Sequence, residues 1–251
     1  MTMMTRYEIT LRPDRPCIPR PEWGYRLYAA LLEEAPEQFG SDVHRDTVTP
    51  LSQFLTVGKD MVTWTVNLLG EETERSLSLL LEQQRSVWLK RDRLRLSVTD
   101  CRSESVRDVD GLFALSARQD GFHVLRFQTP TAFKSQGQYL NLPTSRLIIQ
   151  SLIQKWNGCF PDCPIEDEDG QGVDAIAAGL RCRRFRLRDQ MYYLKGSSIP
   201  GFVGELTLEN RLSGFHRELA DALLLFSGYS GIGIKTALGM GGVLHQMDAS
   251  Q

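Results

Sequence analysis

The order of predicted elements repeats once along this chain, and that repeat constrains the fold more than any other feature. Apolar spacing in the first half predicts a strand, helix, strand, strand, helix and strand, at residues 6–11, 21–34, 51–57, 61–69, 71–88 and 93–98. The same order recurs in the second half at residues 123–133, 144–156, 181–188, 202–208, 215–226 and 242–245. Each half therefore matches the βαββαβ plan of the ferredoxin-like fold, although the halves share no visible sequence identity.

We expect an α+β protein with two tandem ferredoxin-like (RRM-like) domains, residues 1–115 and 120–251, and a glycine-rich loop near the C-terminus. The length of 251 residues and the apolar content of 41% permit one large domain or two of about 120 residues. We interpret the polar residues 108–121 as a linker or a further hairpin, and the acidic residues 162–172 as an exposed loop.

Composition argues against several classes of protein. No apolar run approaches the length of a membrane helix and residues 1–10 lack the pattern of a secretory signal, so we expect a cytoplasmic protein with no membrane partner. Five cysteines at irregular spacing argue against a disulfide framework. Cys159 and Cys163 lack a second Cys/His pair at zinc-site spacing, which favours free thiols over a metal site. The net charge of −2 does not indicate nucleic-acid binding by the chain as a whole.

Residues 228–242, GYSGIGIKTALGMGG, contain six glycines that flank Lys235 and Thr236. Glycine amides can approach a ligand closely, and phosphate is the ligand that such loops most often bind. An ATP loop does not fit because Ile234 separates Gly233 from Lys235, and a dinucleotide fold does not fit because too little chain follows. The alternative is a glycine loop with a structural role only.

The strongest charge feature is residues 181–188, RCRRFRLR. Alternate residues of a strand share a face, so we expect Phe185 and Leu187 to point to a core. The opposite face would carry a cationic stripe of Arg184, Arg186 and Arg188. A solvated strand face and a nucleic-acid contact are equally compatible with this pattern. The same ambiguity holds for a second basic cluster, formed by Lys90, Arg91, Arg93 and Arg95.

Four features together resemble the CRISPR repeat-processing endoribonucleases of the RAMP superfamily. They are the glycine-rich segment, FQTPTAF at residues 127–133, GFVGEL at residues 201–206, and an N-terminal helix leading to His44. The similarity extends over most of the chain. It implies tandem ferredoxin-like domains, RNA as the ligand, and cleavage of precursor CRISPR RNA within its repeats without a metal or other cofactor.

In such cleavage the 2′-hydroxyl of the RNA attacks the adjacent phosphorus, leaving a 2′,3′-cyclic phosphate and a 5′-hydroxyl. The protein supplies proton transfer and charge stabilisation. By resemblance, His44 is the general base or acid, and Tyr28 on the first helix is either a catalytic tyrosine or a packing residue. Some family members place a lysine shortly after the histidine, but residues 45–53 contain none. Arg45 or Lys59 could substitute, or this third role could be absent.

The resemblance also places RNA contacts in the glycine-rich segment and, if the cationic stripe binds RNA, on that strand. Lys235 and the neighbouring amides would grip backbone phosphates, while Tyr229 would stack on a base or close the core. The expected RNA-binding residues are Gly228, Tyr229, Gly231, Gly233, Lys235, Thr236, Gly239, Gly241, Arg184, Arg186 and Arg188. Among the other histidines, packing or capping accounts for His123 and His216, and His245 is the reserve catalytic candidate.

Two other functions stay open from the sequence. The chain could be a non-catalytic RAMP subunit that binds guide RNA in a multi-subunit CRISPR effector complex, or an unrelated two-domain protein with a structural glycine loop. The FQTPTAF segment and the placement of His44 favour the nuclease. Its expected partner is a precursor CRISPR RNA repeat rather than DNA; whether the repeat is a hairpin, and whether the protein is a monomer or a homodimer, are left open.

Overall fold

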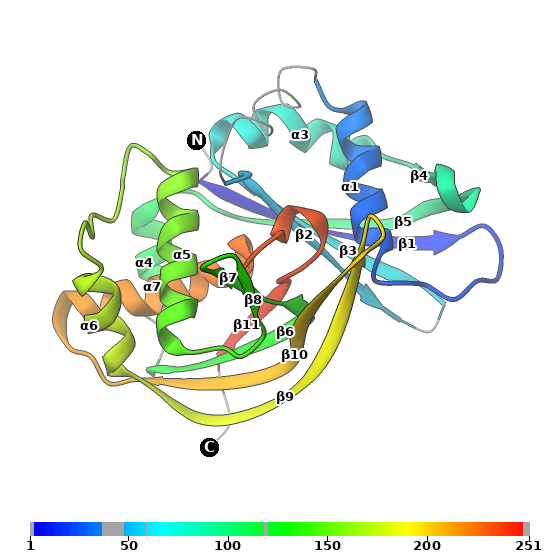
Figure 1. The fold of residues 1–251 in the computed structure, drawn as a ribbon. Coiled ribbons are helices and arrows are strands. Elements are labelled where there is room, and N and C mark those ends of the chain that lie inside the picture. Colours follow the sequence, from blue (N-terminus) through cyan, green and yellow to red (C-terminus); the bar gives the residue numbers. More distant parts are fainter. Residues whose placement is uncertain (1–2, 37–47, 59, 118–119, 248–251) are drawn as a thin grey trace.

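Two antiparallel sheets form the framework of the protein in the computed structural model, which describes residues 3–36, 48–58, 60–117 and 120–247 (Figure 1). The first sheet has the strand order β2-β3-β1-β5-β4, and the second has the order β11-β6-β10-β9. Four strands of each sheet follow the order of a ferredoxin-like unit. The predicted fold class of two tandem ferredoxin-like units is therefore confirmed.

The first unit is a sheet with helices α1 and α3 on one face. Its central strand β1 pairs with β3 and β5, while β4 is an additional strand at the edge. Tyr7, Ile9 and Leu11 alternate along β1 into a buried cluster shared with α1 and α3. The elements are β1 (Met4–Pro13), α1 (Trp23–Glu34), β2 (Leu51–Val57), β3 (Val62–Leu69), α3 (Glu71–Gln83), β4 (Ser86–Leu89), the 3₁₀ helix η1 (Lys90–Asp92) and β5 (Leu94–Val106).

The second unit buries its sheet against α5 and α7. Leu125, Phe127 and Leu206 belong to the same buried cluster as residues of both helices. Helix α5 begins where Thr144 accepts a hydrogen bond from the amide of Leu147, at 3.2 Å. The elements are α4 (Val109–Ser116), β6 (Phe122–Thr131), β7 (Phe133–Ser135), β8 (Gln138–Leu140), α5 (Ser145–Cys159), α6 (Gln171–Gly179), β9 (Leu180–Leu194), β10 (Ser197–Asn210), α7 (Gly214–Ser230), the 3₁₀ helix η2 (Thr236–Leu238) and β11 (Val243–Met247).

The C-terminal end of α7 joins the two units by contacting the helix-free face of the first sheet. Ser52 donates a hydrogen bond to the carbonyl of Tyr229 at 2.6 Å, and Arg6 donates one to the carbonyl of Gly228 at 2.5 Å. The Arg6 guanidinium also lies 4.7 Å from the centre of the Tyr229 ring. The absence of a Cβ at Gly228 eases this approach, since an added Cβ would lie 3.0 Å from the Arg6 guanidinium, which would then have to shift.

Two predicted elements are wrong. The helix predicted at residues 71–88 ends at Gln83, and the β-favouring residues Val87 and Trp88 form β4 instead, which leaves Trp88 48% exposed. Residues 108–121 are neither a linker nor a hairpin, because they contain α4. Asp108 starts this helix by accepting from the amide of Gly111, and α4 then packs on α7.

The second hairpin also differs from expectation. β9 and β10 are longer than predicted, and Figure 1 shows them extending past their own sheet to the end of α1. Phe185 was expected in the core but is 70% exposed, because β9 is the outer strand of its sheet. None of the helices in the described part of the chain is long and apolar enough to cross a membrane.

Candidate functional site

The glycine-rich segment begins inside α7 and then turns tightly around η2. Gly228 is helical, whereas four of the following glycines have positive φ angles between 64° and 96°. Lys235 itself has a φ of 58°. Glycine adopts positive φ angles without the steric penalty of a Cβ, so the positions of the glycines in the sequence indicate where the chain turns. The four residues are Gly231, Gly233, Gly239 and Gly241.

This segment packs directly on the FQTPTAF segment at the end of β6. An added Cβ at Gly233 would lie 2.3 Å from the carbonyl oxygen of Ala132. The two sequence motifs therefore form one structural unit in which backbone packs on backbone. Four hydrogen bonds connect them. The amides of Ile234, Gly241 and Gly242 donate to Ala132 O, Pro130 O and Thr129 Oγ1, at 2.9, 3.0 and 2.9 Å, and the amide of Gln128 donates to Gly242 O at 2.8 Å.

The glycine amides were expected to bind phosphate, but most are already used inside the protein. Those of Gly231, Gly233 and Gly241 donate to Ser227 O, Ser151 Oγ and Pro130 O. These amides are therefore not free to donate to a phosphate, because a donor that is already bonded offers nothing to a ligand. The role of these glycines in RNA binding stays a prediction. Within this segment, which the structure describes in full, the amides of Lys235, Thr236 and Ala237 have no hydrogen-bond acceptor.

A cavity of about 610 Å³ lies between α1, α5 and this segment. Three lysines line it and, among the described residues, no acidic side chain does. This composition suits an anion. Its polar lining comprises Tyr25, Tyr28, Thr49, Ser151, Gln154, Lys155, Lys195, Lys235 and Thr236.

Tyr28 reaches this cavity from α1. Only 6% of it is exposed, and burial raises the pKa of its hydroxyl to about 12. The group therefore stays protonated at neutral pH and can donate a hydrogen bond. His44 and Arg45 lie outside the described residues, as does Lys59. The chain re-enters the described part at Val48, which also lines the cavity.

Lys155 is a site residue that the sequence analysis missed. It reaches the cavity from α5 and donates a hydrogen bond to Thr236 Oγ1 at 2.8 Å. Burial lowers the pKa of its ammonium to about 8, while nearby Cys159 acts weakly in the opposite direction. The sequence did contain a signal for Lys155, because this lysine lies on a helix face whose other members are apolar: Leu152, Trp156 and Cys159. A lysine on such a face calls for a polar partner.

Two predicted RNA-binding groups lie away from this cavity. The face of Tyr229 is occupied by Arg6 and the residue is 8% exposed in the core, which favours the alternative that it closes the core. Its stacking on a base stays a prediction. The cationic stripe does not line this cavity. It lies on the outer strand β9, where Arg186 is paired opposite Glu205. The stripe's role in RNA binding stays a prediction.

His245, the reserve candidate, belongs to a separate buried network. Its Nε2 lies 2.9 Å from His123 Nδ1, and His123 Nε2 lies 2.8 Å from Asp221 Oδ1. Burial, with contributions from His123 and Arg6, lowers the pKa of His245 to about 3. His245 is therefore neutral and internally bonded, and His216 is exposed on α7. In the described ranges no three His, Cys, Asp or Glu side chains lie together as a metal site would require.

Comparison with known proteins adds evidence on the family. Residues 125–243 match the family model of the CRISPR-associated endoribonuclease Cas6. The chain is 30% identical over 227 residues to the Cas6 endoribonuclease of Streptococcus thermophilus, covering 90% of this chain and 92% of that protein. It is 29% identical over 255 residues to the Cas6 endoribonuclease of Mycobacterium tuberculosis, covering 96% and 77%. A solved Cas6 product complex has the same fold, with a TM-score of 0.76 and 23% identity over 97% of this chain and 99% of that one.

Proposed function

The chain belongs to the family of CRISPR-associated Cas6 endoribonucleases, and from this premise we propose that it cleaves precursor CRISPR RNA within its repeats without a metal. The 2′-hydroxyl next to the cut forms a new bond to phosphorus as the bond to the 5′-oxygen breaks. The products are a 2′,3′-cyclic phosphate and a 5′-hydroxyl. The RNA itself provides the nucleophile, so the protein needs a phosphate site and groups that move protons.

The cavity between α1, α5 and the glycine-rich segment is the observation that carries the proposal. It gathers Lys155, Lys195 and Lys235 with no described carboxylate, in a chain whose net charge is −2. A cationic cavity in an acidic protein favours a polyanion at one place on the surface. One wall of the cavity is the glycine-rich segment, one of the features by which the chain resembles the family, so we assign the scissile phosphate to it.

His44 is proposed to transfer the proton. Its imidazole, with an ordinary pKa near 6.5, suits proton transfer at neutral pH. His44 is four residues from Val48 in the sequence, and four residues span at most about 14 Å. Because Val48 lines the cavity, the length of the connection is compatible with this role. One proton leaves the 2′-hydroxyl and one is delivered to the 5′-oxygen, so the protonation of the protein is restored over the reaction.

Lys155 is proposed to take the role of the lysine that is missing after His44. An ammonium at the cavity wall can stabilise the charge that develops on the non-bridging oxygens, and a poorly solvated site strengthens that interaction. Tyr28 would donate a hydrogen bond to the same phosphate or to the leaving oxygen. Lys235 and the unbonded amides beside it would hold the RNA backbone without reading bases. Arg45 is the alternative source of the cation.

The test is cleavage of repeat RNA in excess EDTA. We expect the wild-type protein to cut, and a repeat with a 2′-deoxy sugar at the cut site to stay intact. His44→Ala is expected to slow cleavage by about 10²- to 10⁴-fold, and Lys155→Met by about 10²- to 10³-fold. Lys134→Met is the matched control, because Lys134 is exposed on β7 away from the cavity.

The outcomes separate the alternatives. A metal requirement, or cutting of the 2′-deoxy RNA, would refute the 2′-hydroxyl mechanism. Tight binding without cutting would indicate a non-catalytic RAMP subunit. A protein that does not bind repeat RNA would leave only an unrelated function. Full activity of Lys155→Met would move the cationic role to Arg45.

A further inference from the structure

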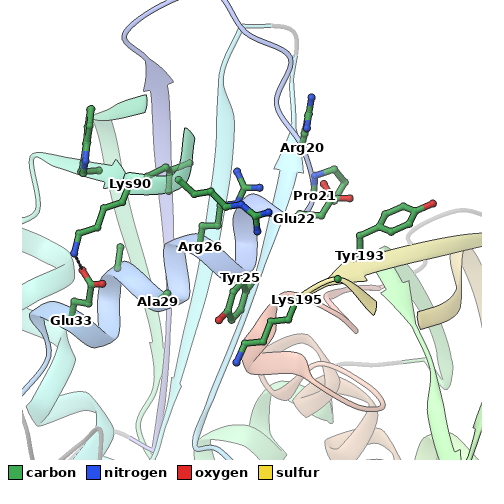
Figure 2. A pocket seen from close by; sticks show the side chains of 15 residues that line it. Arg20, Pro21, Glu22, Tyr25, Arg26, Ala29, Glu33, Lys90, Tyr193 and Lys195 are labelled. Carbon is green, nitrogen blue, oxygen red and sulfur yellow. Dashed lines mark hydrogen bonds and ion pairs between the residues drawn. The ribbon is translucent and has the colours of Figure 1, made fainter. Parts of the chain in front are cut away.

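A second, larger depression of about 1120 Å³ lies between α1, η1 and the tip of the β9–β10 hairpin (Figure 2). We call it the α1–hairpin groove. Its volume exceeds the roughly 300–1,000 Å³ of a typical small-molecule site, which suits a polymer. Its charged and aromatic lining comprises Arg20, Glu22, Tyr25, Arg26, Glu33, Trp88, Lys90, Arg91, Tyr193 and Lys195.

Positive charge exceeds negative charge in the groove. Five of its side chains are basic and two are acidic. Arg26 pairs with Asp92, and Lys90 pairs with Glu33 at 2.5 Å, an interaction drawn in Figure 2. The other basic residues have no ion pair with a carboxylate in the described part of the chain; they are Arg20, Arg91 and Lys195. The groove therefore retains cations that can bind phosphate.

Two exposed aromatic rings lie among these cations. Trp88 on β4 is 48% exposed and Tyr193 on β9 is 57% exposed. Both rings are outside the buried clusters of the two units, so core packing does not account for them. Aromatic rings beside cations are the usual platform for stacking unpaired bases. The flank of a double helix offers phosphates and riboses but no base faces, so this pairing of residue types favours single-stranded RNA.

The groove is continuous with the proposed cleavage cavity. Tyr25, Ala29 and Lys195 line both. The ammonium of Lys195 lies 5.2 Å from the centre of the Tyr25 ring, and Figure 2 shows this pair on facing sides, α1 and the hairpin. An RNA strand with its scissile phosphate in the cavity can therefore continue into the groove without leaving the cationic surface.

We propose that the α1–hairpin groove binds unpaired nucleotides that flank the cleaved phosphate. Trp88 and Tyr193 stack on their bases, while Arg20, Arg91 and Lys195 contact their phosphates. This inference rests on the proposed function, because the cavity sets where the strand begins. It also gives a role to part of the second basic cluster, of which Lys90 and Arg91 reach the groove.

The experiment measures the affinity of non-cleavable, 2′-deoxy repeat RNAs. One RNA is trimmed close to the cut, and others carry an unpaired extension on the 5′ side, an unpaired extension on the 3′ side, or the same extensions base-paired to a complement. We expect one unpaired extension to tighten binding by the wild-type protein at least tenfold. The double variant Trp88→Ala/Tyr193→Ala should lose most of that gain, since one stacked base contributes about 5- to 150-fold.

Three controls make the result specific. Phe215→Ala removes an equally exposed aromatic residue on α7 outside the groove, and should bind all the RNAs as the wild type does. Trp88→Phe/Tyr193→Phe keeps the rings and should retain most of the gain. Arg91→Ala should lower the slope of log affinity against log salt by about 0.7 for the extended RNA. Thermal melting verifies that each variant is folded.

The inference is overturned if extensions add no affinity, if the double variant binds extended RNA as tightly as wild type, or if paired extensions bind as well as unpaired ones. Failure of the proposed function looks different. In that case the wild-type protein cuts no cleavable repeat RNA of any length. A protein that cuts normally but binds the extended RNAs no more tightly than the trimmed RNA refutes only the proposal that the groove binds RNA.

Discussion

Replacing Lys155 with methionine is expected to stabilise the protein at neutral pH while removing most of its cleavage activity. Burial lowers the pKa of Lys155 from 10.5 to about 8. Each pKa unit corresponds to about 1.4 kcal/mol. Holding the charged ammonium in the folded protein therefore lowers the free energy of unfolding by roughly 3 kcal/mol at pH values below the folded pKa.

Two effects reduce the gain from removing this charge. The side chain is only partly buried, so water in the cavity screens the ammonium. Methionine also loses the hydrogen bond to Thr236, which contributes about 1 kcal/mol. Methionine matches the length and helix propensity of lysine, so no further change is expected at this position in α5. The net stabilisation near neutral pH should be about 1–2 kcal/mol.

The pH dependence identifies the cause. Between about pH 8 and 10.5 the folded protein releases the Lys155 proton while the unfolded chain keeps it, so the stability of the wild type rises relative to the variant. The stability gained by Lys155→Met over the wild type is therefore complete below about pH 8 and absent above about pH 10.5. Burial raises the pKa of neighbouring Cys159 to about 12, so its thiol stays neutral throughout.

Urea unfolding at about pH 7 and about pH 10 measures this difference. The pair to compare is wild type and Lys155→Met, with the exposed Lys134→Met as the control that should change little at either pH. A variant that is less stable than wild type at neutral pH would refute the reasoning. So would a stability difference that is the same at both pH values.

Three further predictions concern the framework of the site. Arg6→Ala should destabilise the protein by about 2–4 kcal/mol in urea unfolding, because it removes the contacts to Gly228 and Tyr229 that join the units. Arg102→Ala is the control and should change stability little, because 80% of the Arg102 side chain is exposed. Gly241→Ala should lower the free energy of unfolding by at least about 1 kcal/mol more than Gly137→Ala. Both glycines have positive φ, but only at Gly241 would the added Cβ meet a carbonyl oxygen, that of Ile232 at 2.1 Å. Equal losses of stability in the two variants would contradict this reasoning. Acid should lower the free energy of unfolding between about pH 6.5 and pH 3 by up to about 1.4 kcal/mol per pH unit, because the unfolded chain protonates His245 while the folded protein keeps it neutral. His245→Gln should flatten this part of the plot of stability against pH, and an unchanged slope would rule out His245 as its source.

Most of the fold could be predicted because its signals are local. Alternation along β1 and helical spacing along α5 depend only on neighbouring residues, and both units followed from such patterns. Trp88 and Phe185 were misplaced for a different reason. Trp88 was placed in a helix but lies in the edge strand β4, and Phe185 was expected in the core but lies on the outer strand β9. Which strand lies at the edge of a sheet depends on the pairing of distant strands, so the local pattern could not show it.

The candidate site was predictable only in part. Tyr28 and the glycine-rich segment followed from the resemblance, and the structure brings both to one cavity. The sequence could not show that most glycine amides are already bonded, because their acceptors, such as Ser151 and Pro130, come from other elements. Lys155 was missed because its partner Thr236 is 81 residues away in the sequence.

The sequence alone determined the order of the strands and helices within the two βαββαβ units and the points where the chain must turn, because periodicity and the positive φ of glycine act within a few residues. Only the tertiary structure decided which donors are already bonded and which cations share one cavity. Hydrogen-bond partners and burial are set by contacts between α1, α5, α7 and the β9–β10 hairpin, which lie far apart along the chain and meet only when both units have folded.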